Sequence, residues 1–346
     1  MASLITKANG VGSVKILAEA GIEQIPSAYI KDKDELLQIG HSHFSKEIPV
    51  ISLIKLHGKD RERVLEDIRL ACEEWGIFQI VDHGVTEEIQ KKMMELVHGF
   101  FMLPLDEKLE YAMPADDFCG YANGSFLKDN PGLDWRELYV ARCRPLTRRD
   151  VNKWPARPTG FRETFARYSD EMLSLANLII SAISDSLGLP SNAILEVCGE
   201  TEQKVLLNYY PTCPQAEQTL GLKRHTDPGT ITILLQDNVS GLQATKDGQN
   251  WVTVEPTPGA FVVNLGDHFH VLTNGRLKNA DHRATVNASK TRTTVAAFWN
   301  PAADSKVCPL PALVDEDHPP LFEAETFSEF YNRKMRMAAA KTGTKA

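Results

Sequence analysis

Residues 230–265 read TITILLQDNVSGLQATKDGQNWVTVEPTPGAFVVNL, and this stretch decides the fold. Short runs of Val, Ile, Leu, Thr and Phe alternate with Asp-Asn, Asp-Gly and Pro-Gly pairs, a pattern typical of short strands joined by turns. The pattern continues in both directions and predicts strands near 203–209, 230–236, 241–245, 250–254, 260–264, 269–272, 282–286 and 293–299. Many short strands at close spacing, with no helix between them, favour a double-sheet jelly roll.

Helical patterns flank this strand-rich segment on both sides. We expect a short amphipathic helix over 13–30 that ends near Ile25-Pro26. We expect further helices over 61–75, 87–101, 160–187, 192–197 and 327–340, strands over 48–53 and 77–81, and a long loop region over 114–160. The predicted class is therefore mixed α and β, with a jelly-roll core flanked by helices. We expect three parts, namely an N-terminal helical and mixed region over 1–200, the core over 201–304 and a helical tail over 305–346.

The bulk composition argues against several classes of protein. The 346 residues carry a net charge of -8 and the pI is about 5.7, so there is no electrostatic reason to bind nucleic acid or anionic lipid. No stretch approaches the roughly 20 apolar residues that a membrane span requires. The six cysteines form no CxxC pair, and the N-terminal stretch has no apolar run of the secretory type. We expect a cytoplasmic protein with reduced thiols and with neither nucleic acid nor membrane as a partner.

The strongest chemical signal is His225-Thr226-Asp227, followed by His282. Alternate residues of an extended strand point to the same face, so His225 and Asp227 can present their side chains together. A third ligand from a distant strand then completes one triangular face of an octahedron and leaves three adjacent positions open. Two histidines and one carboxylate in this arrangement are typical of non-haem Fe(II) oxygenases.

Other readings of these histidines stay open on the motif alone. A bare His-x-Asp occurs often by chance, and two His-x-His pairs compete with it, one at His268 and His270 and the other at His41 and His43. The same three ligands can also hold the zinc of a hydrolase.

A second element, Arg292-Thr293-Thr294, lies downstream of His282. A guanidinium binds a carboxylate through two parallel hydrogen bonds, and a hydroxyl two residues further on lies on the same face of a strand. A dicarboxylate co-substrate needs such a receptor at its far end, whereas a zinc hydrolase leaves Arg292 and Thr294 without a role. The combination therefore favours an Fe(II) oxygenase.

Four separated motifs in this order resemble the plant 2-oxoglutarate- and Fe(II)-dependent dioxygenases over nearly the whole chain. They are IPVI at 48–51 with WGIFQIVDHGV at 75–85, NYYPTC at 208–213, the His-x-Asp and distant His, and Arg-x-Thr at 292–294. The resemblance implies Fe(II) bound by His225, Asp227 and His282. It also implies 2-oxoglutarate bound by Arg292 and Thr294, with help from Asn208 and Tyr210. Thr294 replaces the family's usual serine and keeps the hydroxyl.

The closest resemblance is to the flavonoid branch of that family, flavanone 3-hydroxylases and type I flavone synthases. It rests on HTDPGTITILLQD at 225–237, VVNLGDH at 262–268, NGRLKNADH at 274–282 and DWRE at 134–137. It implies a flavanone substrate such as naringenin, with Phe298 stacking on the flavonoid and with Tyr121 and Asn300 as weaker contact candidates. Phe298 lies an even number of residues from Arg292 and Thr294 on the same predicted strand, so its side chain should point to the same inward face. An ordinary core phenylalanine also fits that position.

The chemistry that the resemblance implies is oxidation of a substrate C–H bond by O2, coupled to decarboxylation of 2-oxoglutarate to succinate and CO2, with ascorbate as reductant. Hydroxylation gives a 2- or 3-hydroxyflavanone, and loss of a second hydrogen gives a flavone. One alternative is the same chemistry on another plant metabolite, such as a gibberellin, a phenolic acid or another flavonoid. Another is a catalytically silent ligand-binding jelly roll. The oligomeric state and the carbon that is oxidised stay open.

Overall fold

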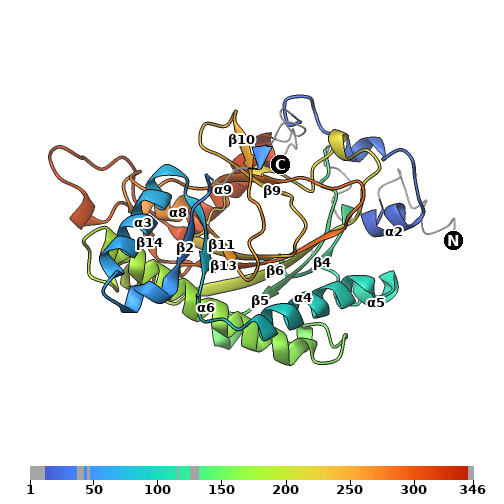
Figure 1. Cartoon of the computed structure of the whole chain (residues 1–346), viewed down its shortest axis with the longest axis horizontal. Helices are drawn as coiled ribbons and strands as arrows, with labels where there is room; N and C mark the ends of the chain where they lie inside the picture. Colours follow the sequence, from blue (N-terminus) through green and yellow to red (C-terminus); the bar gives the residue numbers. More distant parts are fainter. Residues whose placement is uncertain (1–11, 37–42, 45–46, 115–116, 125–131, 342–346) are drawn as a thin grey trace.

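The computed structural model describes residues 12–36, 43–44, 47–114, 117–124 and 132–341. Two β-sheets form its centre, and helices cover the outer face of the larger sheet (Figure 1). The strands are β1 (His43–Phe44), β2 (Val50–Ser52), β3 (Ile77–Val81), β4 (Gly120–Ala122), β5 (Glu137–Arg142), β6 (Glu202–Tyr210), β7 (Leu222–His225), β8 (Ile231–Gln236), β9 (Leu242–Thr245), β10 (Trp251–Thr253), β11 (Phe261–Leu265), β12 (Asp281–Ala284), β13 (Arg292–Asn300), β14 (Lys306–Val307) and β15 (Glu325–Thr326). The helices are α2 (Val14–Glu19), α3 (Arg61–Glu74), α4 (Glu87–Met102), α5 (Leu105–Leu109), α6 (Phe161–Ser186), α7 (Ala193–Cys198), α8 (Asp267–Leu272) and α9 (Phe327–Lys341).

The two large sheets have different compositions. The major sheet has the order β2-β3-β11-β8-β13-β6-β5-β4, and the minor sheet has the order β1-β10-β9-β12-β7. Strands from the N-terminal half extend the major sheet at both edges, because β3 pairs with β11 and β5 pairs with β6. The sheet therefore runs without a break across the boundary predicted at residue 200.

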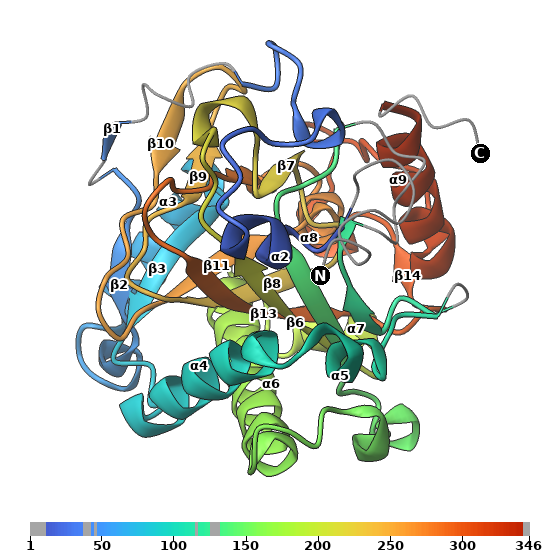
Figure 2. The ribbon, with the colours of Figure 1, turned by 90° about the vertical axis from the view of Figure 1, so that its right-hand side faces the viewer.

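Helices α3, α4 and α6 pack together against the major sheet. Figure 2 shows α4 and α6 beneath β13 and β6. Helix α6 buries one face, which carries Phe161, Phe165, Tyr168, Met172, Leu175, Ile179 and Ile183. Their spacing of three or four residues is that of an amphipathic helix, so burial of this apolar face fixes α6 against the sheet.

The inner faces of the two sheets enclose a second, smaller apolar cluster. It joins Leu234, Val262 and Ala296 of the major sheet to Leu242 and Ala244 of the minor sheet. This arrangement confirms the predicted mixed class with a jelly-roll core. Within the described residues, no helix has the length and apolar character needed to cross a bilayer.

Most predicted elements are confirmed within a few residues, and three predictions are wrong. The predicted strand 269–272 is helix α8. The predicted loop 114–160 contains β4 and β5, and the helix expected within 13–30 is limited to the six residues of α2. Strand β7 was not predicted. Tertiary contacts decide these short elements, which carry little periodicity of their own.

Candidate active site

Three potential metal ligands converge between the two sheets. His225 ends β7, and His282 lies directly opposite it in the antiparallel register of β12. Asp227 follows two residues after the end of β7, so it is placed by a turn and not by the extended strand that the sequence suggested. One ligand atom from each residue lies within 4.8 Å of the other two. This is the only such group of three or more His, Cys, Asp or Glu side chains among the described residues.

Hydrogen bonds to the far atoms orient all three side chains. The Nδ1 atoms of His225 and His282 lie 2.9 Å and 3.0 Å from the carbonyl oxygens of Lys223 and Ala280, respectively. A carbonyl only accepts, so each Nδ1 donates and each Nε2 keeps a free lone pair. The Thr232 hydroxyl donates to Asp227 Oδ2 at 2.6 Å, which leaves Oδ1 on the side of the histidines.

The electrostatic environment keeps His225 neutral. Burial, followed by the neighbouring His282, lowers the pKa of His225 from 6.5 to about 4. A neutral imidazole with a free Nε2 is the form that binds a metal. Together with the Asp227 carboxylate, the donor set fits a divalent iron centre.

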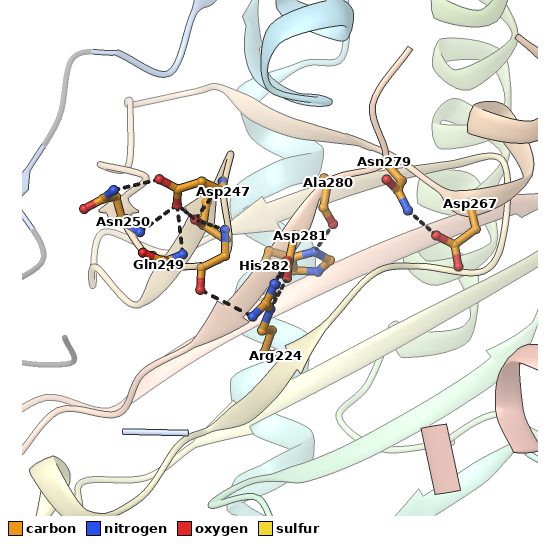
Figure 3. Close-up of polar contacts among 11 residues, drawn as sticks. Arg224, Asp247, Gln249, Asn250, Asp267, Asn279, Ala280, Asp281 and His282 are labelled. Carbon is orange, nitrogen blue, oxygen red and sulfur yellow. Dashed lines mark hydrogen bonds and ion pairs between the residues drawn. The ribbon is translucent and has the colours of Figure 1, made fainter. Parts of the chain in front are cut away.

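An ion pair fastens the strands beside the two histidines. Arg224 precedes His225, and its Nε donates to both carboxylate oxygens of Asp281, which precedes His282, at 3.0 Å and 2.9 Å (Figure 3). Arg224 also donates from Nη1 to the carbonyl of Gly248 at 3.3 Å. These contacts fix the ladder of β7 and β12 on the side facing away from the ligands.

A close backbone approach fixes the turn that carries Asp227. The Asp267 N–H donates to the Asp227 carbonyl at 2.7 Å, and the Gly266 N–H donates to the Thr230 carbonyl at 2.9 Å. A Cβ on Gly266 would lie 2.1 Å from the Gly229 carbonyl oxygen, so no larger residue fits there. Glycine at 266 therefore allows the turn to seat against α8.

The four residues assigned to 2-oxoglutarate by resemblance form two cross-strand pairs. On β13 and β6, Arg292 lies opposite Tyr210, and Thr294 lies opposite Asn208. All four line the same cavity as the three potential ligands. The strand pairing thus places a cation and a hydroxyl next to the metal ligands.

Arg292 is a buried cation that lacks a carboxylate partner. It is 3% exposed, and it donates to the Val239 carbonyl at 3.1 Å and to Gln236 Oε1 at 3.0 Å. Within the described part of the chain, no carboxylate lies within ion-pair distance of its guanidinium. Asp237 attracts the guanidinium from beyond ion-pair distance. A buried guanidinium without a direct ion pair is costly, so the pocket fits a ligand that brings a carboxylate.

The rest of the cavity wall is mainly apolar. Phe298 lies on it, with Leu206, Leu222, Leu234, Leu242 and Ala296. Asn264 adds a polar group to this wall, because its side-chain oxygen is buried and has no hydrogen-bond partner among the described residues. The cavity therefore has a charged end at Arg292, a metal-binding face and an apolar wall.

Comparison with known proteins agrees with this geometry. Residues 201–301 match the model of the 2OG-Fe(II) oxygenase superfamily, and residues 48–157 match the N-terminal model described as non-haem dioxygenase in morphine synthesis. The chain is 45% identical over 309 residues to the naringenin,2-oxoglutarate 3-dioxygenase of Hordeum vulgare, covering 89% of this chain and 82% of that one. It belongs to the 2OG-Fe(II) oxygenase superfamily.

Two further relatives extend this result. A flavone synthase of Petroselinum crispum is 45% identical over 311 residues, covering 89% of this oxygenase and 85% of the relative. The crystal structure of JOX2 in complex with 2OG, Fe and JA superposes with a TM-score of 0.83 at 35% identity, covering 94% of this chain and 93% of that one. The family thus uses Fe(II) as its metal cofactor and 2-oxoglutarate and O2 as co-substrates.

Two of the predicted substrate contacts, Tyr121 and Asn300, do not line the cavity. Tyr121 does not line the cavity of this oxygenase; it is fully buried, and its hydroxyl donates to Glu137 Oε2 at 2.7 Å. Lys108 Nζ donates to the same oxygen at 2.7 Å, so Tyr121 belongs to a buried ionic cluster. Asn300 lies beside Gly229, also outside the cavity lining, whereas Phe298 lines it.

The competing histidine pair at 268 and 270 has ordinary structural contacts. His268 Nδ1 lies 2.8 Å from the Thr230 hydroxyl, and His270 Nδ1 lies 2.6 Å from the Leu277 carbonyl. Both residues lie in α8, outside the candidate metal cluster. Of the other pair, His41 lies outside the described residues.

Sequence reasoning missed three polar residues around this site: Thr232 behind Asp227, Gln236 beside Arg292, and Arg136, whose Nη1 donates to Asn208 Oδ1 at 2.8 Å. Thr232 lies two residues before Leu234 on β8, so both side chains point to the same face of the sheet, and Leu234 lines the cavity. This alternation is the sequence signal that places Thr232 at the site. No sequence pattern points to the contact between Arg136 and Asn208, because the sequence predicts a loop where β5 lies.

Proposed function

We propose that this oxygenase oxidises a flavanone, with Fe(II) held by His225, Asp227 and His282. The convergence of these ligands, each with its far atom hydrogen-bonded, supports the metal assignment. Bound Fe(II) supplies the redox chemistry that activates O2. The side chains supply one face of its coordination sphere and leave the other face to the reactants.

The co-substrate 2-oxoglutarate binds with its distal carboxylate on Arg292 and Thr294, and with Asn208 and Tyr210 at its sides. The observation that carries this assignment is the buried Arg292 guanidinium, which has no carboxylate partner among the described residues. A bidentate contact from a carboxylate supplies the direct ion pair that Arg292 lacks. The Thr294 hydroxyl lies two residues along the same strand and on the same face.

The flavanone lies against the apolar wall, with its aromatic surface on Phe298. The support is the identity of about 45% to a naringenin dioxygenase and to a flavone synthase, together with the position of Phe298 beyond Thr294 on β13. Aromatic surface packs on a phenylalanine ring by offset or edge-on contact. The substrate would then lie between the apolar wall and the three side chains that would hold the metal.

The test is an assay with purified protein, Fe(II), ascorbate, 2-oxoglutarate and naringenin, with products resolved by mass. Succinate together with a product lighter by two hydrogens means desaturation to a flavone, whereas a product heavier by one oxygen means hydroxylation. Succinate without an oxidised flavonoid would retain the oxygenase and reject the flavanone in favour of another plant metabolite. No succinate with any member of a substrate panel would instead favour the silent binding protein.

A further inference from the structure

Arg136 lies next to the co-substrate pocket without lining it. It directly precedes β5, which pairs with β6 so that Leu138 lies opposite Asn208. From there its Nη1 reaches Asn208 Oδ1 at 2.8 Å. On the other side of the same amide, Asn208 Nδ2 donates to Thr294 Oγ1 at 3.2 Å. A continuous chain of donors therefore runs from Arg136 through Asn208 to Thr294.

The charge on Arg136 determines which way the Asn208 amide points. A guanidinium can only donate, so it selects the amide oxygen and turns the amide NH2 group towards Thr294. Thr294 Oγ1 then accepts from Asn208, and its own hydroxyl hydrogen is free to point at a ligand. Without Arg136 the amide can rotate by half a turn, and its oxygen would then compete for that hydrogen.

Other contacts hold Arg136 in place. Arg136 Nη2 lies 3.9 Å from Asp134 Oδ2, and the Arg136 side chain is 16% exposed. The second oxygen of Asp134 accepts from Lys31 Nζ at 2.9 Å and from the Lys223 N–H at 3.1 Å. Asp134 thus ties Arg136 both to the N-terminal segment and to β7, the strand that ends in His225.

We propose that Arg136 is a positioning residue for 2-oxoglutarate, acting through the orientation of the Asn208 amide and hence of the Thr294 hydroxyl. The inference rests on the proposed function, because it assumes that Asn208 and Thr294 meet the co-substrate. Arg136 itself does not touch the co-substrate in this arrangement.

The test measures binding without turnover. The protein is loaded with Mn(II), and the affinities for Mn(II) and then for 2-oxoglutarate are measured by calorimetry. Arg136→Met should weaken 2-oxoglutarate about tenfold, the size expected when a charge-assisted hydrogen bond is lost. It should not weaken Mn(II) binding, because it removes a positive charge near His225. Arg136→Lys keeps a charged donor and should recover most of the loss. Arg142→Met is the matched control, since Arg142 is the last residue of β5, the strand that Arg136 precedes, has the same 16% side-chain exposure and pairs with Asp117 and Glu202.

A double-mutant cycle separates an indirect role from a direct one. In an Asn208→Ala background, Arg136→Met should change the 2-oxoglutarate affinity by less than about twofold, because no amide remains to orient. An undiminished effect there would overturn the proposal in favour of direct attraction between Arg136 and the co-substrate. Unchanged 2-oxoglutarate binding in Arg136→Met itself, with or without a weaker flavanone affinity, would overturn it as well.

A second variant keeps the test decisive if Arg136→Met does not fold. Asn208→Asp keeps Arg136 in place but removes the NH2 group that faces Thr294, so it should weaken 2-oxoglutarate as much as Asn208→Ala. Full affinity in Asn208→Asp would overturn the proposal. Failure of the co-substrate assignment gives a different result, because the wild-type protein would then bind Mn(II) but not 2-oxoglutarate. Failure of the flavanone assignment alone leaves 2-oxoglutarate binding, and hence this test, unchanged.

Discussion

Replacing Thr232 with valine isolates the hydrogen bond that orients Asp227. Thr232 and Asp227 are 4% and 5% exposed, and the bond between Thr232 Oγ1 and Asp227 Oδ2 measures 2.6 Å. Valine has nearly the shape of threonine, so the substitution removes the donor and leaves no cavity. A buried hydrogen bond to a charged group contributes about 1.5–3 kcal/mol, and loss of a residue behind a metal ligand costs about 10–100-fold in metal affinity. The two ranges agree, since about 1.4 kcal/mol corresponds to a factor of ten.

The assay is a competition between the protein and a chelating indicator for Mn(II), with Thr230→Val as the matched control. The Thr230 hydroxyl is equally buried, but its partner is His268, which is not a candidate ligand. We expect at least a tenfold loss of Mn(II) affinity in Thr232→Val and no loss in Thr230→Val. Equal affinity in both variants and the wild type would show that Asp227 does not need this bond, and would refute the reasoning.

Three further predictions concern stability and coupling. Lys108→Met should lower the free energy of unfolding by about 3 kcal/mol, since it leaves the fully buried Glu137 without its cation. Chemical denaturation measures this change, and Lys91→Met, which breaks a fully exposed ion pair, should have little effect. Equal effects of the two substitutions would contradict the prediction. Phe298→Ala should raise the KM for flavanone and release succinate without oxidised product while sparing 2-oxoglutarate affinity; a change in neither KM nor coupling would remove the stacking role. Burial lowers the pKa of His268 from 6.5 to about 3. Its contribution to the free energy of unfolding is therefore complete above pH 6.5 and is lost as the pH falls towards 3. His268→Gln should flatten this dependence of the melting temperature on pH, and an unchanged slope would contradict it.

The parts of the fold that could be predicted carry strong periodicity or strong turn signals. Helix α6 has 26 residues with a continuous apolar face, and β8 (ITILLQ) and β13 (RTTVAAFWN) are rich in β-branched and other apolar residues. Residues with such patterns depend little on contacts made elsewhere in the chain. The candidate ligands could be brought together from the sequence because the motifs were recognisable, and the register of β7 and β12 supplies the physical reason.

The elements of the fold that could not be predicted from the sequence depend on contacts with residues far away along the chain. Strand β7 reads Leu-Lys-Arg-His, which has no β-branched residue, and it pairs only with β12 at the edge of its sheet. In β5 the buried positions alternate as expected, but one of them is Glu137, whose charge hides the pattern until its partners Lys108 and Tyr121 are known. Helix α8 begins where the Asp267 N–H meets the Asp227 carbonyl, a contact that no local sequence signal reveals.

The position of β13 in the major sheet has a consequence for how the chain reaches its native state. This strand pairs with β6 on one side and β8 on the other, although both precede it in the sequence, and Asn300 lies opposite Glu202. Strands β6 and β8 cannot complete their hydrogen bonding until β13, which follows them in the sequence, inserts between them. Folding is therefore dominated by contacts between distant residues and should be slow. A chain ending before residue 292 would expose two unpaired strand edges in the middle of the sheet, and such edges recruit other chains. Expression of this oxygenase therefore depends on keeping the segment through Asn300 intact, and partly synthesised chains are the species most exposed to aggregation.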